Sequence, residues 1–277
     1  MASAAHSAPG QAGNAGNGIR HTVAIASGKG GVGKSTVSVN LAVALARQGA
    51  KVGLLDADLY GPSIPKMMGV NRMPQSVNGM LEPLEAHGVR LMSLGFLLPD
   101  GTPTIWRGPM VAGAIQQFVR EVDWGALDYL LVDLPPGTGD AQLTLAQALA
   151  LRGAVIVMTP QDVAMQIARK ALTMFRQLQV PILGILENMS GFVCPHCGSA
   201  APVFKRGGGR KASEALQVPF LGEVPLDPAI CQASDEGVPI VAARPQSPVA
   251  EAFRGIAAAL VERMAAEENP APAIRME

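Results

Sequence analysis

The sequence has few cysteines, no long apolar run and no net charge. Its 277 residues include only three cysteines, too few for a disulfide framework, so metal or redox chemistry in a reducing cytosol is the better explanation for them. No run approaches the roughly 20 apolar residues that a membrane-spanning helix needs. Lys plus Arg and Asp plus Glu both number 22, so no overall field attracts nucleic acid or an anionic membrane. We therefore expect a cytoplasmic protein that binds neither.

The two ends of the chain differ in composition from the rest. Residues 1–18 are mainly Ala, Gly, Asn and Ser without an apolar segment, which argues against a secretory signal and predicts a disordered tail. Residues 269–277 are expected to form a second tail. The length of the remaining part, residues 19–268, fits one large α/β domain with a substantial core.

Apolar runs alternate with helical patterns along this domain. Residues 21–27 form a β-branched apolar run before a glycine loop, residues 35–48 have helical spacing, and residues 51–58 form a second strand. This βαβ unit predicts parallel strands joined by a right-handed crossover. Further predicted elements are strands at residues 89–95, 129–133, 154–159, 182–187 and 220–222, and helices at residues 111–122, 142–149 and 163–178. The pattern is typical of a mainly parallel sheet with helices on both faces, a three-layer α/β fold.

Two segments interrupt this alternation. Residues 60–78 are rich in Pro, Gly and Met, and residues 189–210 are rich in Gly and contain a cysteine pair. Both are predicted to be long functional loops outside the sheet.

A phosphate-binding motif follows the first predicted strand. Residues 28–35 match G-x-x-x-x-G-K-S/T in full, between a strand and a helix, as in a P-loop NTPase. The glycines let backbone N–H groups close around phosphates, Lys34 reaches the β- and γ-phosphates, and Ser35 ligates Mg²⁺. We expect ATP and Mg²⁺ to be bound by Gly28, Lys29, Gly30, Gly31, Val32, Gly33, Lys34, Ser35 and Thr36.

Three aspartates end predicted strands near this motif. Asp133 ends an apolar strand at the sheet edge where ligands bind, which suits a Mg²⁺ ligand. Asp56 and Asp58 end the second strand, and we assign Asp56 to the support of Mg²⁺ and Asp58 to the attacking water. The alternative for Asp56 is that it only caps the following turn. A rigid turn at residues 135–140 is expected near the γ-phosphate.

Lys29 is unusual because a second lysine adds positive charge close to the phosphates. With it, residues 29–35 resemble the signature K-G-G-x-G-K-S/T of the deviant Walker A ATPases. The resemblance implies that Lys29 reaches the partner's nucleotide across a dimer interface, so that hydrolysis depends on dimerisation, as with an arginine finger. We expect slow ATP hydrolysis catalysed by Lys29, Lys34 and Asp58.

A C-x-x-C pair, Cys194 and Cys197, lies in the second irregular segment, where two thiolates can converge on one metal. A 4Fe-4S cluster or a structural zinc usually takes four protein ligands, so a two-fold dimer would supply the other two. His196 is expected to point away. A thioredoxin-like redox pair fits poorly, because it would begin a helix; a zinc site and unliganded cysteines remain alternatives. Cys231 stands alone, is expected to be a small buried hydrophobe, and is left out of the site.

Several separate motifs together resemble the Mrp/ApbC family of iron-sulfur cluster carriers, from about residue 21 to about residue 260. They read SGKGGVGKST at 27–36, LDADLYGPS at 55–63, WRGPM at 106–110, DLPPGTGD at 133–140, ENMS at 187–190 and CPHC at 194–197. The resemblance implies an ATPase of the MinD/ParA-like superfamily that holds a 4Fe-4S cluster between the cysteine pairs of a homodimer. It also implies that Asn188 contacts adenine, and that the cluster passes from an assembly scaffold to apoproteins in a cycle coupled to ATP.

Two features depart from the family pattern. Residues 1–18 stand where many relatives carry an extra N-terminal domain, which puts partner recruitment in doubt. Phe204 is followed by Lys205 and Arg206 where a glycine commonly follows the phenylalanine. The two positive charges beside the cysteines either attract an acidic recipient or form a solvated basic turn.

Two other functions share some of these motifs. Septum-positioning and DNA-partition ATPases have the same loop and fold, but membrane-bound members need a basic amphipathic C-terminal helix. Residues 249–268 instead place Phe253, Ile256, Leu260 and Met264 on one face, which we expect to pack on the core, and no clustered basic surface for DNA is visible. The other alternative is an ATPase with a structural zinc between subunits, which residue types do not separate from a cluster carrier.

Overall fold

A computed structural model describes residues 18–58, 61–97, 108–194, 197, 199–201 and 203–268. The predicted tails (apart from residue 18), residues 106 and 107 of the WRGPM motif, and His196 lie outside the described residues. None of the helices in the described part of the chain combines the length and apolarity needed to cross a membrane.

The described residues fold around a nine-stranded, mainly parallel sheet. Its spatial order is β10 (Ala200–Ala201), β9 (Ile182–Val193), β8 (Gly153–Met158), β1 (Ile19–Ala26), β7 (Leu127–Asp133), β2 (Val52–Asp56), β6 (Val89–Ser93) and β5 (Leu84–Ala86), while β11 (Phe220–Leu226) also pairs with β9. The pairs β5–β6 and β9–β10 are antiparallel and the other pairs of this sheet are parallel. A separate antiparallel hairpin is formed by β3 (Ser76–Val77) and β4 (Met80–Leu81).

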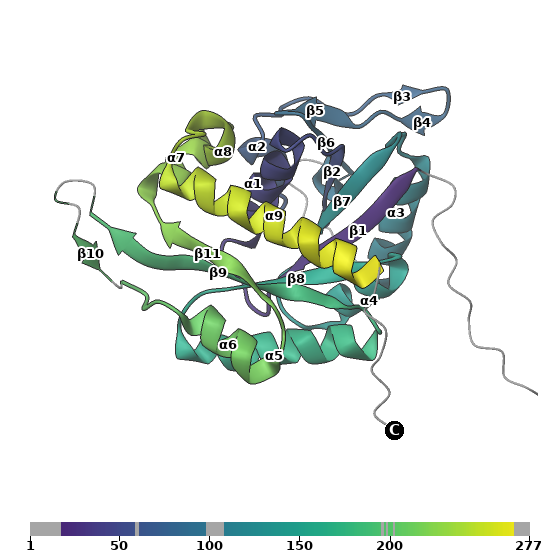
Figure 1. The fold of residues 1–277 in the computed structure, drawn as a ribbon. Coiled ribbons are helices and arrows are strands. Elements are labelled where there is room, and N and C mark those ends of the chain that lie inside the picture. Colours follow the sequence, from purple (N-terminus) through teal and green to yellow (C-terminus); the bar gives the residue numbers. More distant parts are fainter. Residues whose placement is uncertain are drawn as a thin grey trace, which may run out of the picture.

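Helices cover both faces of the sheet, as the sequence predicts (Figure 1). One face carries α1 (Lys34–Arg47), α2 (Ile64–Met67), α7 (Pro228–Asp235), α8 (Ile240–Ala243) and α9 (Pro248–Glu268). The other carries α3 (Gly108–Glu121), α4 (Asp140–Ala148), α5 (Asp162–Gln177) and α6 (Gly208–Leu216), and the short 3₁₀ helix η1 (Leu94–Leu97) follows β6. Alternate β1 residues pack into the two cores, Val23 into the first and Ala24 into the second. This burial on both faces explains why the strands are continuously apolar.

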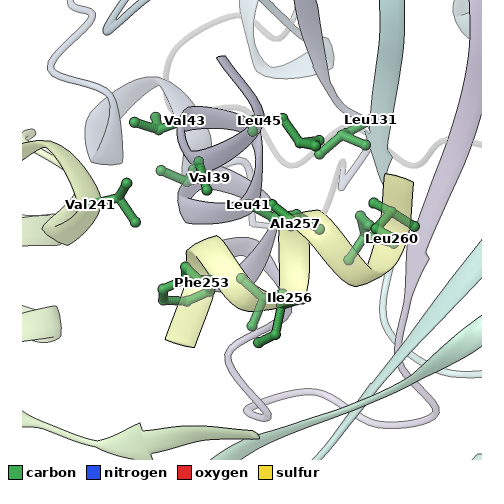
Figure 2. Close-up of a cluster of buried hydrophobic side chains, with 14 of the residues drawn as sticks. Val39, Leu41, Val43, Leu45, Leu131, Val241, Phe253, Ile256, Ala257 and Leu260 are labelled. Atoms are coloured by element: carbon green, nitrogen blue, oxygen red, sulfur yellow. The ribbon is translucent and has the colours of Figure 1, made fainter. Parts of the chain in front are cut away.

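The C-terminal helix α9 packs against α1. Figure 2 shows Phe253, Ile256 and Leu260 of α9 beside Leu41 of α1. These four side chains and Met264 are all buried. The prediction that this face of the helix packs on the core is confirmed.

The structure differs from the sequence predictions at both irregular segments and at one cysteine. The prediction that residues 189–210 lie outside the sheet is wrong, because β9 continues to Val193 and β10 pairs with it antiparallel. The cysteine pair is thus at the tip of a β-hairpin that extends from the sheet (Figure 1). The described part of residues 60–78 contains helix α2 and strand β3. Cys231 is exposed rather than buried, because α7 turns it toward solvent.

Candidate nucleotide site and cysteine hairpin

The loop between β1 and α1, which we call the P-loop, has the conformation that its glycines allow. Gly31 and Gly33 have φ angles of 77° and 78°, in the left-handed region that other residues rarely adopt. The loop borders a cavity of about 210 Å³, lined by Ser27, all residues from 29 to 36, Asp58, Ser63, Met67 and Pro136. The residues predicted to bind nucleotide therefore line this cavity, except for Gly28 and Asn188, and Asp56 and Asp133, predicted for Mg²⁺, are not in its lining.

Asp133 organises the start of helix α1. It is fully buried and lies 2.7 Å from Lys34 Nζ, and it accepts hydrogen bonds of 2.6 Å from the hydroxyls of Ser35 and Ser38. Register places it here, because parallel strands β2 and β7 end side by side at the carboxyl edge of the sheet. A hydroxyl and a carboxylate are oxygen ligands of the kind that Mg²⁺ prefers, so Ser35 and Asp133 fit this metal.

Asp56 and Asp58 have different surroundings. Both carboxylate oxygens of Asp56 accept hydrogen bonds, from the N–H groups of Asp58 and Ile64 and from the Ser93 hydroxyl. These contacts are those of a turn-capping carboxylate, one of the two roles that the sequence leaves open. Burial, and secondarily the charge of Asp133, raise the pKa of Asp56 to about 7. Asp58 instead lines the cavity, with its carboxylate 3.8 Å from Lys34 Nζ.

Lys29 also lines the cavity, and its ammonium group donates a 3.2 Å hydrogen bond to Gln161 Oε1 of the same chain. The predicted turn at residues 135–140 lies against the loop, since Gly137 N donates to the carbonyl of Ser27 and Pro136 lines the cavity. The expectation that this turn lies near the phosphate site therefore agrees with the structure.

Asn188 lies behind the P-loop, on strand β9. Its buried side-chain amide donates a 2.8 Å hydrogen bond to the carbonyl of Val32. The contact is tight, because a methyl group added to Gly33 would lie 2.3 Å from Asn188 Nδ2. Asn188 is thus joined to the nucleotide loop through its backbone, and adenine contact by this residue remains a prediction.

The cysteine pair is at the tip of the β9–β10 hairpin. Cys194 N donates a 3.0 Å hydrogen bond to the carbonyl of Ser199, which closes the turn. Cys194 is half-buried and Cys197 is exposed. Hydrogen bonds, first from the Ser199 side chain and backbone and then from the Cys194 thiol, lower the pKa of Cys197. A lowered thiol pKa favours the thiolate, the form that ligates metals.

Arg206, one of the two basic residues beside the cysteines, contacts strand β11. Arg206 forms an ion pair with Glu223 of β11, which also accepts a 3.1 Å hydrogen bond from Ser190. The hydrogen bond from Arg206 is the main cause of the lowered pKa of Glu223, and the positive charge of Arg206 lowers this pKa further. Arg206 thus links the hairpin to β11, while Lys205 and Arg206 both remain exposed, as expected of a solvated basic turn.

Sequence reasoning missed several residues that support these sites. Ser38 follows Lys34 by four residues, so one helix face carries both toward Asp133, a spacing that sequence alone could have shown. Gln161, which binds Lys29, follows a strand without any motif to mark it. Glu187 is buried and accepts hydrogen bonds from the N–H groups of Gly207 and Gly209. It thereby caps helix α6, whose own N-cap residue has no side chain to do so.

The site can be compared with known proteins. The model of the ParA family described as NUBPL iron-transfer P-loop NTPase matches residues 18–261. The iron-sulfur cluster carrier protein of Deinococcus radiodurans is 53% identical over 245 residues, which are 88% of this chain and 69% of that protein.

Two solved structures extend the comparison. A nucleotide-binding protein of Archaeoglobus fulgidus, solved in complex with ADP, is 44% identical with a TM-score of 0.72, covering 79% of this chain and 87% of that one. The cell division ATPase MinD of Pyrococcus furiosus has a TM-score of 0.66 and 23% identity, covering 87% and 98% of the two chains. At this identity the likeness to MinD shows the fold alone.

Proposed function

Because the chain belongs to the NUBPL family of iron-transfer P-loop NTPases, we propose that it is an ATP-hydrolysing carrier of a 4Fe-4S cluster. The observation that carries this proposal is the position of the two cysteines. They follow directly after β9, and Asn188 of the same strand is bonded to the P-loop. One element thus joins a phosphate-binding loop to a pair of metal-binding thiols.

Hydrolysis uses the cavity above the P-loop. ATP phosphates are held by the loop N–H groups and by Lys34, with Mg²⁺ on Ser35 and Asp133. Asp58 orients the attacking water, because it is the aspartate of the pair that faces the cavity. Asp56 supports the metal from behind, through the turn that it caps.

Catalysis requires two chains. Lys29 releases Gln161 and reaches the nucleotide of a second copy, where it stabilises charge on the transferring phosphoryl group. The hydrogen bond between the Lys29 ammonium group and Gln161 is easily exchanged for a stronger contact with phosphate. Asn188, on strand β9, contacts the adenine of the nucleotide.

The cluster is bound between two hairpins. Each chain supplies Cys194 and Cys197, and a second copy supplies the remaining two of the four thiolates that a cubane cluster takes. Exposure of Cys197 suits a cluster that is cargo, since a recipient must reach it. The cluster is received from an assembly scaffold and passed to apoproteins in the cytoplasm, where free thiols stay reduced.

The test is anaerobic reconstitution with iron and sulfide, on the unmodified protein, on Cys194→Ala and on the control Cys231→Ser. Cys231 is exposed and lies on α7, outside the hairpin. We expect a brown dimer with about four irons, the content of one cubane, which is lost in Cys194→Ala and kept in the control.

Two other outcomes of this reconstitution would contradict the proposal and favour a different function. Bound zinc without visible absorption identifies an ATPase stapled by a structural metal, because zinc is colourless and redox-silent. A monomer that binds neither metal favours a spatial-organisation ATPase, whose fold the chain shares.

A further inference from the structure

Strand β9 connects the nucleotide site to the cysteine hairpin without a break in the chain. Asn188 contacts the P-loop and Cys194 follows directly after the end of the strand. The six residue steps from Asn188 to Cys194 span about 20 Å when extended. For movement at the P-loop to reach the cysteines along this strand, the backbone of β9 between them must be able to change conformation.

The strand is irregular between the two sites. On β11, Val224 pairs with Asn188 and Leu226 pairs with Phe192, so β9 contains two extra residues where β11 advances by two. Met189 and Gly191 both have left-handed backbones, with φ of 59° and 66°. A left-handed glycine is common in a bulge, but a left-handed methionine is rare and is kept only where its surroundings hold it. We call residues 189–191 the β9 bulge.

One side of the bulge rests on the P-loop. A methyl group added to Gly33 would lie 3.6 Å from Met189 Cε, next to the Asn188 amide. Met189 is half-buried in this position. The Asn188 amide and the Met189 methyl thus both lie on the side of Gly33 toward which a side chain would project.

The other side of the bulge is bonded to the hairpin. Ser190 donates to Glu223, the same carboxylate that pairs with Arg206. Gly191 N donates a 3.3 Å hydrogen bond to the carbonyl of Lys205, in the limb that returns from the cysteines. The bulge, which belongs to the β9 limb of the hairpin, therefore lies next to the P-loop and is bonded to strand β11 and to the returning limb.

We propose that the β9 bulge transmits the nucleotide state of the P-loop to the cysteine hairpin, with Met189 as the positioning residue. This regulation rests on the proposed function. When the loop closes on a γ-phosphate, Val32 and Gly33 move against Asn188 and Met189, and the left-handed backbone of Met189 changes. The hairpin turns with it, because Gly191 is bonded to Lys205 of the hairpin and Ser190 shares Glu223 with Arg206. Such an element couples two sites when it has two arrangements that both sites bias.

The experiment measures thiol alkylation in the cluster-free protein, with Cys231→Ser as the background so that only the hairpin cysteines react. Rates are compared without nucleotide, with MgADP and with MgATP, each at a saturating concentration for the variant. We expect MgATP to change the rate about tenfold, within the usual range of allosteric coupling. Met189→Gly should reduce this change to less than about twofold, because glycine accepts the left-handed backbone but removes the contact with the loop.

Two controls separate this role from a merely structural one. Met189→Leu keeps an apolar side chain against Gly33 and should retain the response to MgATP. Gln217→Gly makes the same backbone change at a left-handed position with φ of 53°, at the exposed end of α6, and should also retain it.

The outcomes distinguish this inference from the proposed function. A response to MgATP that survives in Met189→Gly overturns the role of the bulge, as does the absence of any response in the unmodified hairpin. Because the assay uses no iron, both results are obtained whether or not the hairpin binds a cluster. Failure of iron binding, by contrast, is seen only in reconstitution.

Discussion

Replacing Gly33 with alanine adds one methyl group at a crowded position of the P-loop. Gly33 has a left-handed φ of 78°, which costs an alanine about 1–2 kcal/mol. The new Cβ would also lie 2.3 Å from Asn188 Nδ2 and must displace the amide that bonds to Val32. Loss of this buried hydrogen bond costs about 1–2 kcal/mol more. We expect the free energy of unfolding to fall by about 2–4 kcal/mol in total.

Gly31→Ala is the matched control for this prediction. Gly31 has a φ of 77°, and a Cβ at this position meets no atom within 4 Å. Gly31→Ala therefore lowers the free energy of unfolding only by the cost of a left-handed alanine backbone, about 1–2 kcal/mol. Urea unfolding followed by circular dichroism should place Gly33→Ala about 1–2 kcal/mol below Gly31→Ala. Equal destabilisation of the two variants would refute the claim that Asn188 is packed tightly on the loop.

Three further predictions follow from the core and the site. The pKa of Asp56 is raised from 3.8 to about 7, so the folded protein retains a proton that the unfolded chain releases, and stability falls as pH rises through this window. Between about pH 5 and pH 7, Asp56→Asn should reduce this fall in unfolding free energy by about 2 kcal/mol, measured by urea titration at each pH. If the dependence of unfolding free energy on pH is the same in the variant, Asp56 is not protonated. Phe253→Ala should cost about 3–5 kcal/mol of unfolding free energy, because it empties a fully buried site under α9; a loss below about 1 kcal/mol would count against that packing. Lys29→Ala should lower the rate of ATP hydrolysis about 10³-fold while nucleotide affinity changes far less, and an unaltered rate would exclude catalysis by Lys29.

The P-loop and the sheet could be predicted from sequence because their signals are local. The motif at residues 28–35 predicts the phosphate-binding loop, and the apolar patterns before and after it predict the strand and the helix that flank it. The short βαβ unit predicts that β1 and β2 are parallel, and they are, with β7 inserted between them. Strands β2 and β7 end together at Asp56 and Asp133.

The hairpin could not be predicted because its strand lacks the usual pattern. The sequence ENMSGFV has no alternation of polar and apolar residues, and its Ser and Gly indicate a loop. The reason lies in the bulge, where Met189 and Gly191 have left-handed backbones and β9 has two more residues than the paired stretch of β11. The contact between Arg206 and Glu223 was equally hidden, since it depends on how β11 pairs with β9.

The two aspartates at the end of β2 show a finer limit. The sequence places both at the end of the same apolar run, so the pattern itself does not show which of them faces the nucleotide. Their difference comes from the strand end, since Asp56 turns inward to cap the next turn while Asp58 lies beyond the strand and faces the cavity. Residue type alone carries no information on that direction.

The central claim is that the cysteine hairpin gives its cluster to another protein. The most direct measurement is the return of activity to an apo 4Fe-4S enzyme mixed with the reconstituted carrier, with a chelator present to bind free iron. We predict that activity returns with about one cluster transferred per dimer, and that Cys197→Ser restores none. A carrier that keeps its cluster while the enzyme stays inactive, or a Cys197→Ser variant that restores activity equally well, would contradict the claim.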